Sequence, residues 1–104
     1  MNIEGSPPDI DIPHIWCDLN AVGLSDETAD IRYYSLHREI LNRLRPIQGM
    51  IVFIYDEDVS DTGEAEIFGY VASLEHTTFR GNPHWRARPR EDSWYRGPAP
   101  WEGG

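Results

Sequence analysis

Two stretches of apolar residues on either side of an acidic loop constrain the fold of this chain more than any other feature. Met50–Tyr55 is an unbroken apolar run rich in β-branched residues, and it lies between Gly49 and the acidic loop Asp56–Glu64. A run this short between such breakers favours a strand over a helix. Apolar residues then alternate through Ala65–Glu75, as they do in a strand with two different faces. The pattern predicts an antiparallel β-hairpin that pairs Met50–Tyr55 with Ile67–Leu74.

The first of these strands needs cover on both faces, because a strand that is apolar on both sides is usually buried on both. The segment Leu36–Arg45 has apolar residues at helical spacing between a suitable N-cap, Ser35, and the helix-ending Pro46, so we expect the main helix there. One helix covers one face of a sheet, so another part of the chain must cover the other face. Gly69, inside the second strand, indicates a β-bulge.

Further strands are expected before and after this hairpin. Alternation over His14–Ala21 predicts a half-buried strand, and Ile31–Tyr34 forms either a second strand that pairs back on the first or the entry to the helix. His84–Arg88 fits a short last strand. A single helix cannot supply the crossovers of a multi-strand parallel sheet. We therefore expect an α+β, mainly β fold: a small twisted antiparallel sheet with one helix, curled toward an open SH3-like barrel. A flat sheet with one helix packed on it is the alternative.

The chain of 104 residues fits one domain. Prolines at positions 7, 8 and 13 remove backbone donors, so residues 1–13 are expected to form an extended N-terminal arm. Residues 14–96 form the predicted single globular domain. The Gly- and Pro-rich residues 97–104 are expected to be a flexible C-terminal tail.

The charge pattern limits the kinds of partner. The chain carries 18 acidic and 9 basic residues, which gives a formal net charge of −9 at pH 7. A net negative charge repels nucleic-acid backbones and anionic membranes, so binding to either needs a local cluster of arginines. All 9 basic residues are arginine, a bias that indicates a GC-rich bacterial genome.

The sequence also predicts a cytoplasmic protein without a membrane span. Cys17 is the single cysteine, so no intramolecular disulfide is expected. The first residues lack the cationic start and apolar run of a secretory signal. The longest apolar run, Met50–Tyr55, is far shorter than the roughly 20 residues that cross a bilayer.

No motif predicts a metal, a cofactor or a reaction. His14-x-x-Cys17 has the spacing of two zinc ligands, but no second pair completes a set of four, and residues three apart on a strand point to opposite faces. The acidic stretch Asp56–Glu66 does not match a calcium-binding loop in either register. A nucleophile elbow and a phosphate-binding glycine loop are absent. Cys17 with His37 is the one nucleophile–base pair that the sequence suggests.

The most unusual segment combines arginines and aromatic residues near the C-terminus. Its candidate binding residues are Arg80, Trp85, Arg86, Arg88, Arg90, Trp94, Tyr95 and Arg96. Aromatic faces beside guanidinium groups are typical of single-stranded nucleic-acid binding. Alternatively the segment docks on the domain itself, with its rings over Met50–Tyr55 and its arginines paired to the acids of Asp56–Glu66. We favour this self-docking arrangement, because the central strand needs a second cover.

Three functions compete on this basis. The first is a non-enzymatic interaction or regulatory protein that binds a protein partner, in particular a basic one, through an acidic face with Asp56, Asp58 and Asp61 as candidate residues. The second is a nucleic-acid-binding module that uses residues 80–96. The third is a small hydrolase. The lack of a catalytic motif favours the first.

Overall fold

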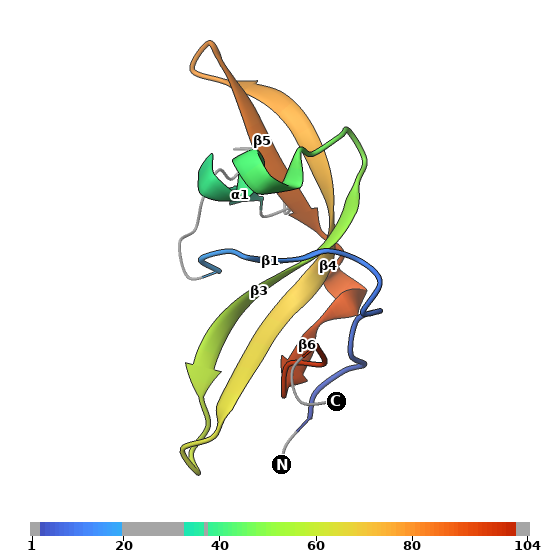
Figure 1. Cartoon of the computed structure of the whole chain (residues 1–104), viewed down its shortest axis with the longest axis vertical. Helices are drawn as coiled ribbons and strands as arrows, with labels where there is room; N and C mark the ends of the chain where they lie inside the picture. Colours follow the sequence, from blue (N-terminus) through green and yellow to red (C-terminus); the bar gives the residue numbers. More distant parts are fainter. Residues whose placement is uncertain (1–2, 20–32, 37, 102–104) are drawn as a thin grey trace.

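A computed structural model describes residues 3–19, 33–36 and 38–101 of the chain (Figure 1). Within these ranges one helix and a long, strongly twisted pair of hairpins form a body of 45 × 28 × 21 Å. The elements in chain order are β1 (His14–Trp16), β2 (Tyr34–Ser35), α1 (Arg38–Leu44), β3 (Ile51–Val59), β4 (Ala65–Phe79), β5 (Asn82–Pro89), the 3₁₀ helix η1 (Glu91–Ser93) and β6 (Tyr95–Gly97).

The predicted central hairpin is confirmed. β3 and β4 pair antiparallel in a continuous register from Ile51 opposite Ser73 to Val59 opposite Ala65. The predicted loop Asp56–Glu64 is wrong in its first half, because β3 continues through the acidic residues as far as Val59. Glu57 and Asp58 are exposed and the buried Asp56 carboxylate is hydrogen-bonded, so the polarity of these residues does not end the strand. The turn itself spans residues 60–64.

The sheet is mixed and open. Among the described residues, six strands form one sheet in the order β1-β3-β4-β5-β2, with β6 also paired to β4. The predicted mainly β fold with one helix is confirmed, but a purely antiparallel sheet is wrong, because β1 runs parallel to β3. One crossover that contains α1 is enough to make one parallel pair. The SH3-like barrel is not confirmed, since the sheet does not close.

The long strand β4 organises the rest of the sheet. One of its edges pairs with β3, and its other edge pairs first with β6 and then with β5. η1 fills the gap between these two strands: the backbone N–H of Val71 donates to Ser93 Oγ at 2.9 Å, and Arg90 N–H donates to the Val71 carbonyl at 2.9 Å. The β4 backbone therefore remains hydrogen-bonded where the strand ladder is interrupted.

The outer strands and the helix deviate from the predicted bounds in small ways. α1 lies within the predicted helix Leu36–Arg45, and β5 extends the predicted strand His84–Arg88 by a few residues. β2 pairs with β5 rather than with β1. The predicted strand His14–Ala21 is observed only as β1, and its last residues, like the start of the predicted Ile31–Tyr34 strand, lie outside the described residues.

The prediction that the central strand is buried on both faces is confirmed. Val52, Phe53 and Ile54 each have 0% exposure. Val52 and Ile54 belong to a cluster on the α1 side of the sheet, which is completed by Ile15, Cys17, Tyr34, Leu36, Ile40, Ala72, Leu74 and Ala87. Phe53 belongs to a second cluster with Ile67 and Tyr95, against which Ile12, Tyr55, Val71, Ala99 and Trp101 pack.

Gly69 permits a close approach of β4 to β3. A Cβ atom at this position would lie 1.9 Å from the backbone oxygen of Ile54. The register passes through Gly69, opposite Tyr55 on one side and Tyr95 on the other, without an extra residue. The predicted bulge is therefore absent, and the glycine is required because the neighbouring backbone occupies the space of a side chain.

Both ends of the described chain pack against the sheet. Glu4 forms an antiparallel bridge with Arg96, in which both N–H···O bonds measure 2.9 Å. The ring of Trp101 stacks on His14 with a centroid separation of 4.0 Å and lies 4.8 Å from the Tyr55 ring. Trp101 is thus part of the packed structure, which corrects its assignment to a free tail.

No helix in the described residues is long and apolar enough to cross a membrane.

Trp101→Ala should lower the free energy of unfolding by about 2 kcal/mol, because the variant loses the ring contacts with His14, Tyr55 and Phe53 on the second cluster. Chemical denaturation followed by circular dichroism measures the change. Ile47→Ala is the control, since Ile47 is 68% exposed and should change the midpoint little. Equal, negligible effects of the two substitutions would show that the stack does not stabilise the fold.

Candidate functional site

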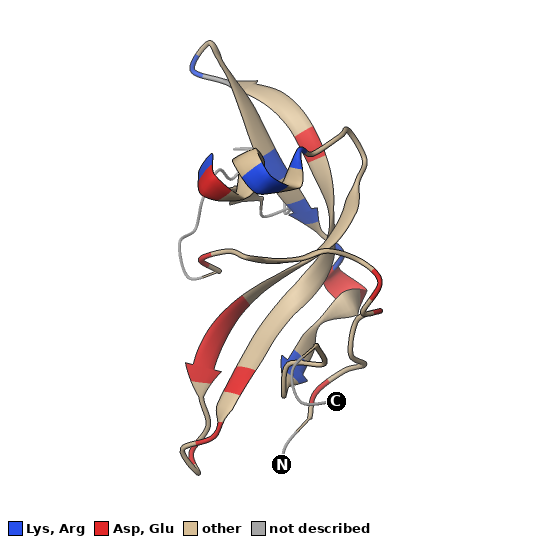
Figure 2. Cartoon of the chain, in the orientation of Figure 1, with Lys and Arg blue, Asp and Glu red and all other residues tan. Residues whose placement is uncertain are grey.

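Carboxylates gather at the turn end of the β3–β4 hairpin, the lower end in Figure 2. β3 changes from apolar to acidic at Asp56, where it leaves the two clusters that cover its centre. The side chains there surround a hollow of about 370 Å³, which we call the acidic hollow. It is lined by Glu4, Asp58, Val59, Ser60, Asp61, Thr62, Glu64, Glu66 and Arg96.

The turn holds two of these acids toward solvent. Ser60 N–H donates to the Glu64 carbonyl at 2.8 Å, and Gly63 N–H donates to the Ser60 carbonyl at 2.9 Å. Gly63 has a φ of 84°, a conformation that favours glycine. The side chain of Ser60 also accepts from Glu64 N–H at 3.1 Å. These bonds order the turn, so Asp61 and Glu64 lie at defined, exposed positions.

Arg96 is the single cation of the acidic hollow among the described residues that line it. β6 places Arg96 opposite Phe68 of β4, next to the hairpin. Its Nη2 atom donates to Asp58 Oδ2 at 3.1 Å and to Glu66 Oε1 at 3.2 Å. Five carboxylates and one guanidinium therefore share the acidic hollow, so it carries an excess of negative charge.

Glu4 reaches the acidic hollow from the N-terminal arm. Its backbone is fixed by the bridge to Arg96, and its Oε2 atom accepts a hydrogen bond from Trp94 Nε1 at 2.9 Å. The Trp94 ring packs in turn on Phe68 and Tyr70, with centroid separations of 5.8 and 5.1 Å. The arm and the C-terminal segment thus hold each other against the hairpin.

Asp56, a candidate binding residue from the sequence, lies inside the structure. It is 8% exposed, and its carboxylate accepts hydrogen bonds from Glu57 N–H at 2.8 Å and Leu19 N–H at 3.3 Å. These bonds connect β3 to the segment that follows β1. Asp56 is therefore a structural acceptor, whereas the candidates Asp58 and Asp61 line the acidic hollow.

The pKa values of Asp58, in the acidic hollow, and of Tyr95, beside Arg96, are shifted. The backbone N–H of Val59 and then the Arg96 guanidinium stabilise the Asp58 carboxylate and lower its pKa. Burial raises the pKa of Tyr95, whose hydroxyl donates to the Pro98 carbonyl at 2.6 Å. Asp58 is thus charged at neutral pH, whereas Tyr95 keeps its proton and holds the chain that leads to Trp101.

The arginine and aromatic candidates divide into three groups. Trp94, Tyr95 and Arg96 pack on the hairpin beside the acidic hollow. Trp85 contacts His76 at 4.9 Å, and Arg86 pairs with Glu75 at 3.1 Å and lies 3.7 Å over the Tyr33 ring. The remaining candidates are exposed: Arg80, Arg88 and Arg90. Residues 80–96 therefore do not form one continuous binding strip, and most of their rings and two of their arginines dock on the domain.

The two residues of the zinc-like pair lie in different surroundings. His14 is exposed beside Trp101, whereas Cys17 is buried and donates to the Ser35 carbonyl at 3.4 Å. Burial, with smaller effects of Asp18 and Asp56, raises the pKa of Cys17 to about 12, so the thiol stays protonated at neutral pH. His37 lies outside the described residues. No group of three metal-ligating side chains occurs in the described part of the chain.

Three acids of the site are not among the binding residues predicted from the sequence. Glu66 lies directly opposite Asp58 in the hairpin register, and Glu64 belongs to the turn, so a correct strand boundary would have placed both. Glu4 lies far from the hairpin in sequence. No local pattern predicts its contact with Trp94.

The pKa of Asp58 provides a test of this geometry. A carboxyl whose pKa is lowered on folding stabilises the folded state above its ordinary pKa, and this contribution is lost as the pH falls through the lowered value. Arg96→Met should raise the pKa of Asp58 only in part, because the larger cause, the Val59 N–H bond, remains. An NMR titration of the Asp58 carboxyl measures both values. A complete return to the ordinary pKa in the variant would contradict the backbone contribution.

Similarity to other proteins adds no information about this site. Comparison with known protein families, with curated proteins and with solved structures finds no match. The function is therefore inferred from the geometry and charge of the described residues.

Proposed function

We propose that this chain is a non-enzymatic interaction module that binds a basic segment of a partner protein in the acidic hollow. One observation carries the proposal: five carboxylates surround the hollow, and its one guanidinium, on Arg96, is already shared by Asp58 and Glu66. A cationic segment would supply the charge that the hollow lacks. A cytoplasmic location, inferred from the single Cys17, forms part of this proposal.

Repulsion between the acids at the hairpin end lowers the stability of the fold. Asp58 and Glu66 lie directly opposite each other on adjacent strands, a position in which like charges are destabilising. Arg96 offsets this repulsion, but Glu4, Asp61 and Glu64 add further negative charge without another base among the lining residues. A cluster of like charges at one end of a hairpin is typical of a surface that steers and binds a cationic partner.

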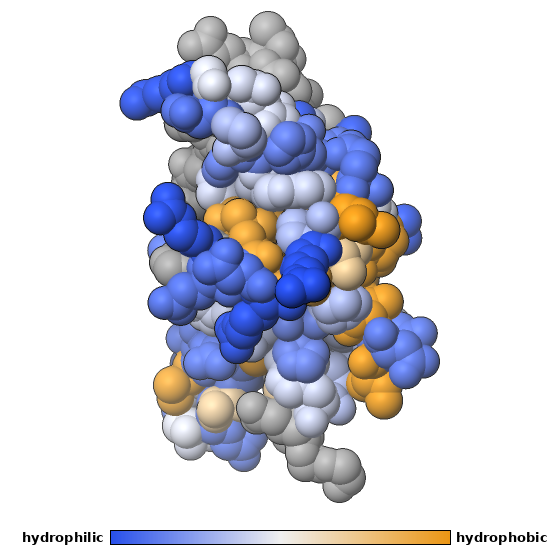
Figure 3. Space-filling view, turned by 45° about the horizontal axis from the view of Figure 1, so that its top comes forward, coloured by the Kyte–Doolittle hydropathy of each residue, from blue (hydrophilic) through white to orange (hydrophobic). Residues whose placement is uncertain are grey.

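The surface character agrees with recognition by charge. On the face seen in Figure 3, hydrophobic surface lies in separate patches that hydrophilic side chains divide. The residues that line the acidic hollow are polar or charged apart from Val59, so a partner that docks there meets mainly polar groups. Charged contacts of this kind contribute to association rate and specificity more than to affinity.

The rings that the nucleic-acid alternative needs for stacking already have contacts within the domain. Trp94 packs on Phe68 and Tyr70, Tyr95 is 2% exposed, and Trp85 contacts His76. Single-stranded nucleic acids need accessible rings as well as arginines. The hydrolase alternative finds no support either, since Cys17 is buried and protonated.

A neutralising double variant tests the proposal. Asp61→Asn with Glu64→Gln removes two exposed carboxylates that take no part in the Arg96 ion pairs. Its binding of a fluorescently labelled arginine-rich octapeptide should be several-fold weaker than that of the unmodified chain, since each exposed ion pair contributes roughly 0.2–1 kcal/mol. Fluorescence anisotropy at low and high salt measures the change, and binding should weaken as salt rises.

Glu91→Gln with Asp92→Asn is the matched control, because it removes the same charge from η1, outside the lining of the acidic hollow. The control should bind the peptide nearly as well as the unmodified chain. Equal losses in both variants would show that net charge, and not the acidic hollow, attracts the peptide. Tighter binding of a single-stranded oligonucleotide than of the peptide would favour the nucleic-acid function instead.

A further inference from the structure

β1 is an edge of the sheet with unused hydrogen-bonding groups. Among the described strands it pairs only with β3, as shown by the bonds from Phe53 N–H to the Pro13 carbonyl and from Cys17 N–H to the Tyr55 carbonyl, both 2.8 Å. Because alternate residues of a strand turn their backbone groups to opposite sides, the N–H and C=O groups of His14 and Trp16 point away from β3. Within the described part of the chain, no hydrogen bond satisfies these groups.

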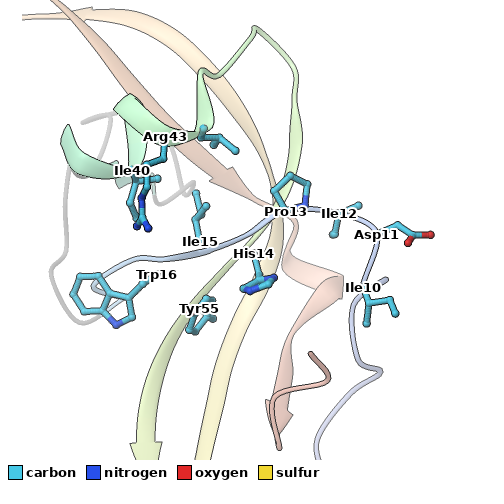
Figure 4. A pocket seen from close by; sticks show the side chains of 11 residues that line it. Ile10, Asp11, Ile12, Pro13, His14, Ile15, Trp16, Ile40, Arg43 and Tyr55 are labelled. Atoms are coloured by element: carbon cyan, nitrogen blue, oxygen red, sulfur yellow. The ribbon is translucent and has the colours of Figure 1, made fainter. Parts of the chain in front are cut away.

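A groove lined by more apolar than polar residues follows this free edge. It has a volume of about 590 Å³ and lies between α1 and the aromatic residues of β1 and β3 (Figure 4). Trp16, in its lining, is 44% exposed although it is a large apolar residue. An unpaired edge strand beside apolar surface is a template for another extended strand. The groove is lined by Ile10, Asp11, Ile12, Pro13, His14, Ile15, Trp16, Ile40, Arg43, Leu44 and Tyr55.

We propose that a second copy of this chain occupies the groove, with the two β1 strands paired antiparallel about a two-fold axis at Ile15. In this register His14 of each copy lies opposite Trp16 of the other. Both residues present their backbone groups outward, so each such pair exchanges two N–H···O bonds. β1 thus supplies both the donors and the acceptors that a second β1 strand needs, as a symmetric dimer interface requires.

The side chains agree with this register. His14 and Trp16 pair with Phe53 and Tyr55 in β3, so all four lie on the same face of the sheet. Trp16 of one copy would lie beside His14 of the other, which is already stacked on Trp101 at 4.0 Å. The aromatic layer would therefore continue from one copy into the next, and it would cover the exposed indole of Trp16. Cross-strand aromatic pairs of this kind stabilise a sheet.

Charge complementarity supports the antiparallel direction. Arg43 lies at the Trp16 end of the groove (Figure 4) and makes no ion pair with another described residue. The N-terminal arm of the second copy, which carries Asp9 and Asp11, would run toward this end. Asp18 would lie opposite Ile12 of the other copy, so no carboxylates directly face each other across the axis.

The association is expected to depend on concentration. β1 contains three residues, and an interface of this length is at the small end, where complexes are transient. Sedimentation velocity of the full chain should therefore show the mass rise from 12.0 kDa toward twice that value as concentration increases. A single 12.0 kDa species at all concentrations would overturn the proposal.

Trp16→Pro is the discriminating variant. It removes the outward N–H and the indole, but the β1–β3 bonds of Pro13 and Cys17 remain, and proline is tolerated where a strand edge faces solvent. The variant should remain folded by circular dichroism and should be monomeric. Ile47→Ala, an exposed isoleucine outside the groove, should dimerise like the unmodified chain. A dimer that persists in Trp16→Pro would contradict the proposed interface.

Amide hydrogen exchange of the unmodified chain gives a second test that needs no variant. The His14 and Trp16 amides should exchange more slowly as concentration rises, because dimerisation gives them acceptors. The Cys17 amide, bonded to Tyr55 within one copy, should not respond. Equal responses of all three amides, or none, would place any dimer contact elsewhere.

Discussion

The structure depends on the burial of one strand on both faces. Val52 and Ile54 of β3 face the cluster beneath α1, and Phe53 between them faces the cluster that β6 and Trp101 complete. The two covers come from different parts of the chain, before and after the central hairpin. With one cover alone, an apolar face of β3 would remain in water, at a free-energy cost of roughly 25 cal/mol for every Å² of apolar surface. Folding therefore requires the helix and the C-terminal segment together.

The proposed functions follow from where this burial ends. Beyond Tyr55 neither cluster covers β3, and its residues become acidic while the strand pairing with β4 continues to Val59. The hydrogen-bonded hairpin thus presents carboxylates that the fold does not bury, apart from Asp56. At the side of the sheet, the crossover that brings α1 over one face leaves β1 as an edge. The acidic hollow and the β1 groove are therefore distinct surfaces of one architecture, and the proposals made for them stand independently.

Local patterns in the sequence predict the hairpin and the helix. The alternation in Ala65–Glu75 and the helical spacing in Leu36–Arg45 each arise because one element packs on the surface next to it. Local patterns also predict that arginines of the C-terminal segment pair with hairpin acids, and Arg96 does so. They do not predict the parallel partner of β1, since a half-buried strand looks the same in either direction. Contacts such as Glu4 with Trp94 and His14 with Trp101 join residues far apart in sequence and have no local signal. Asp56 looks like its acidic neighbours, and only its place opposite the segment after β1 makes it an internal acceptor.

Native-state hydrogen exchange in increasing denaturant tests the central role of β3 most directly. Val52, Phe53 and Ile54 are each fully buried, and Phe53 N–H is bonded to Pro13 while its neighbours pair with β4. Their amides should exchange only through global unfolding, together with that of Tyr95 in β6 and that of Leu44, whose acceptor four residues earlier lies within α1. Exchange of the β3 amides through a local opening, while the helix or the C-terminal segment stays protected, would contradict the dependence of the fold on the doubly covered strand.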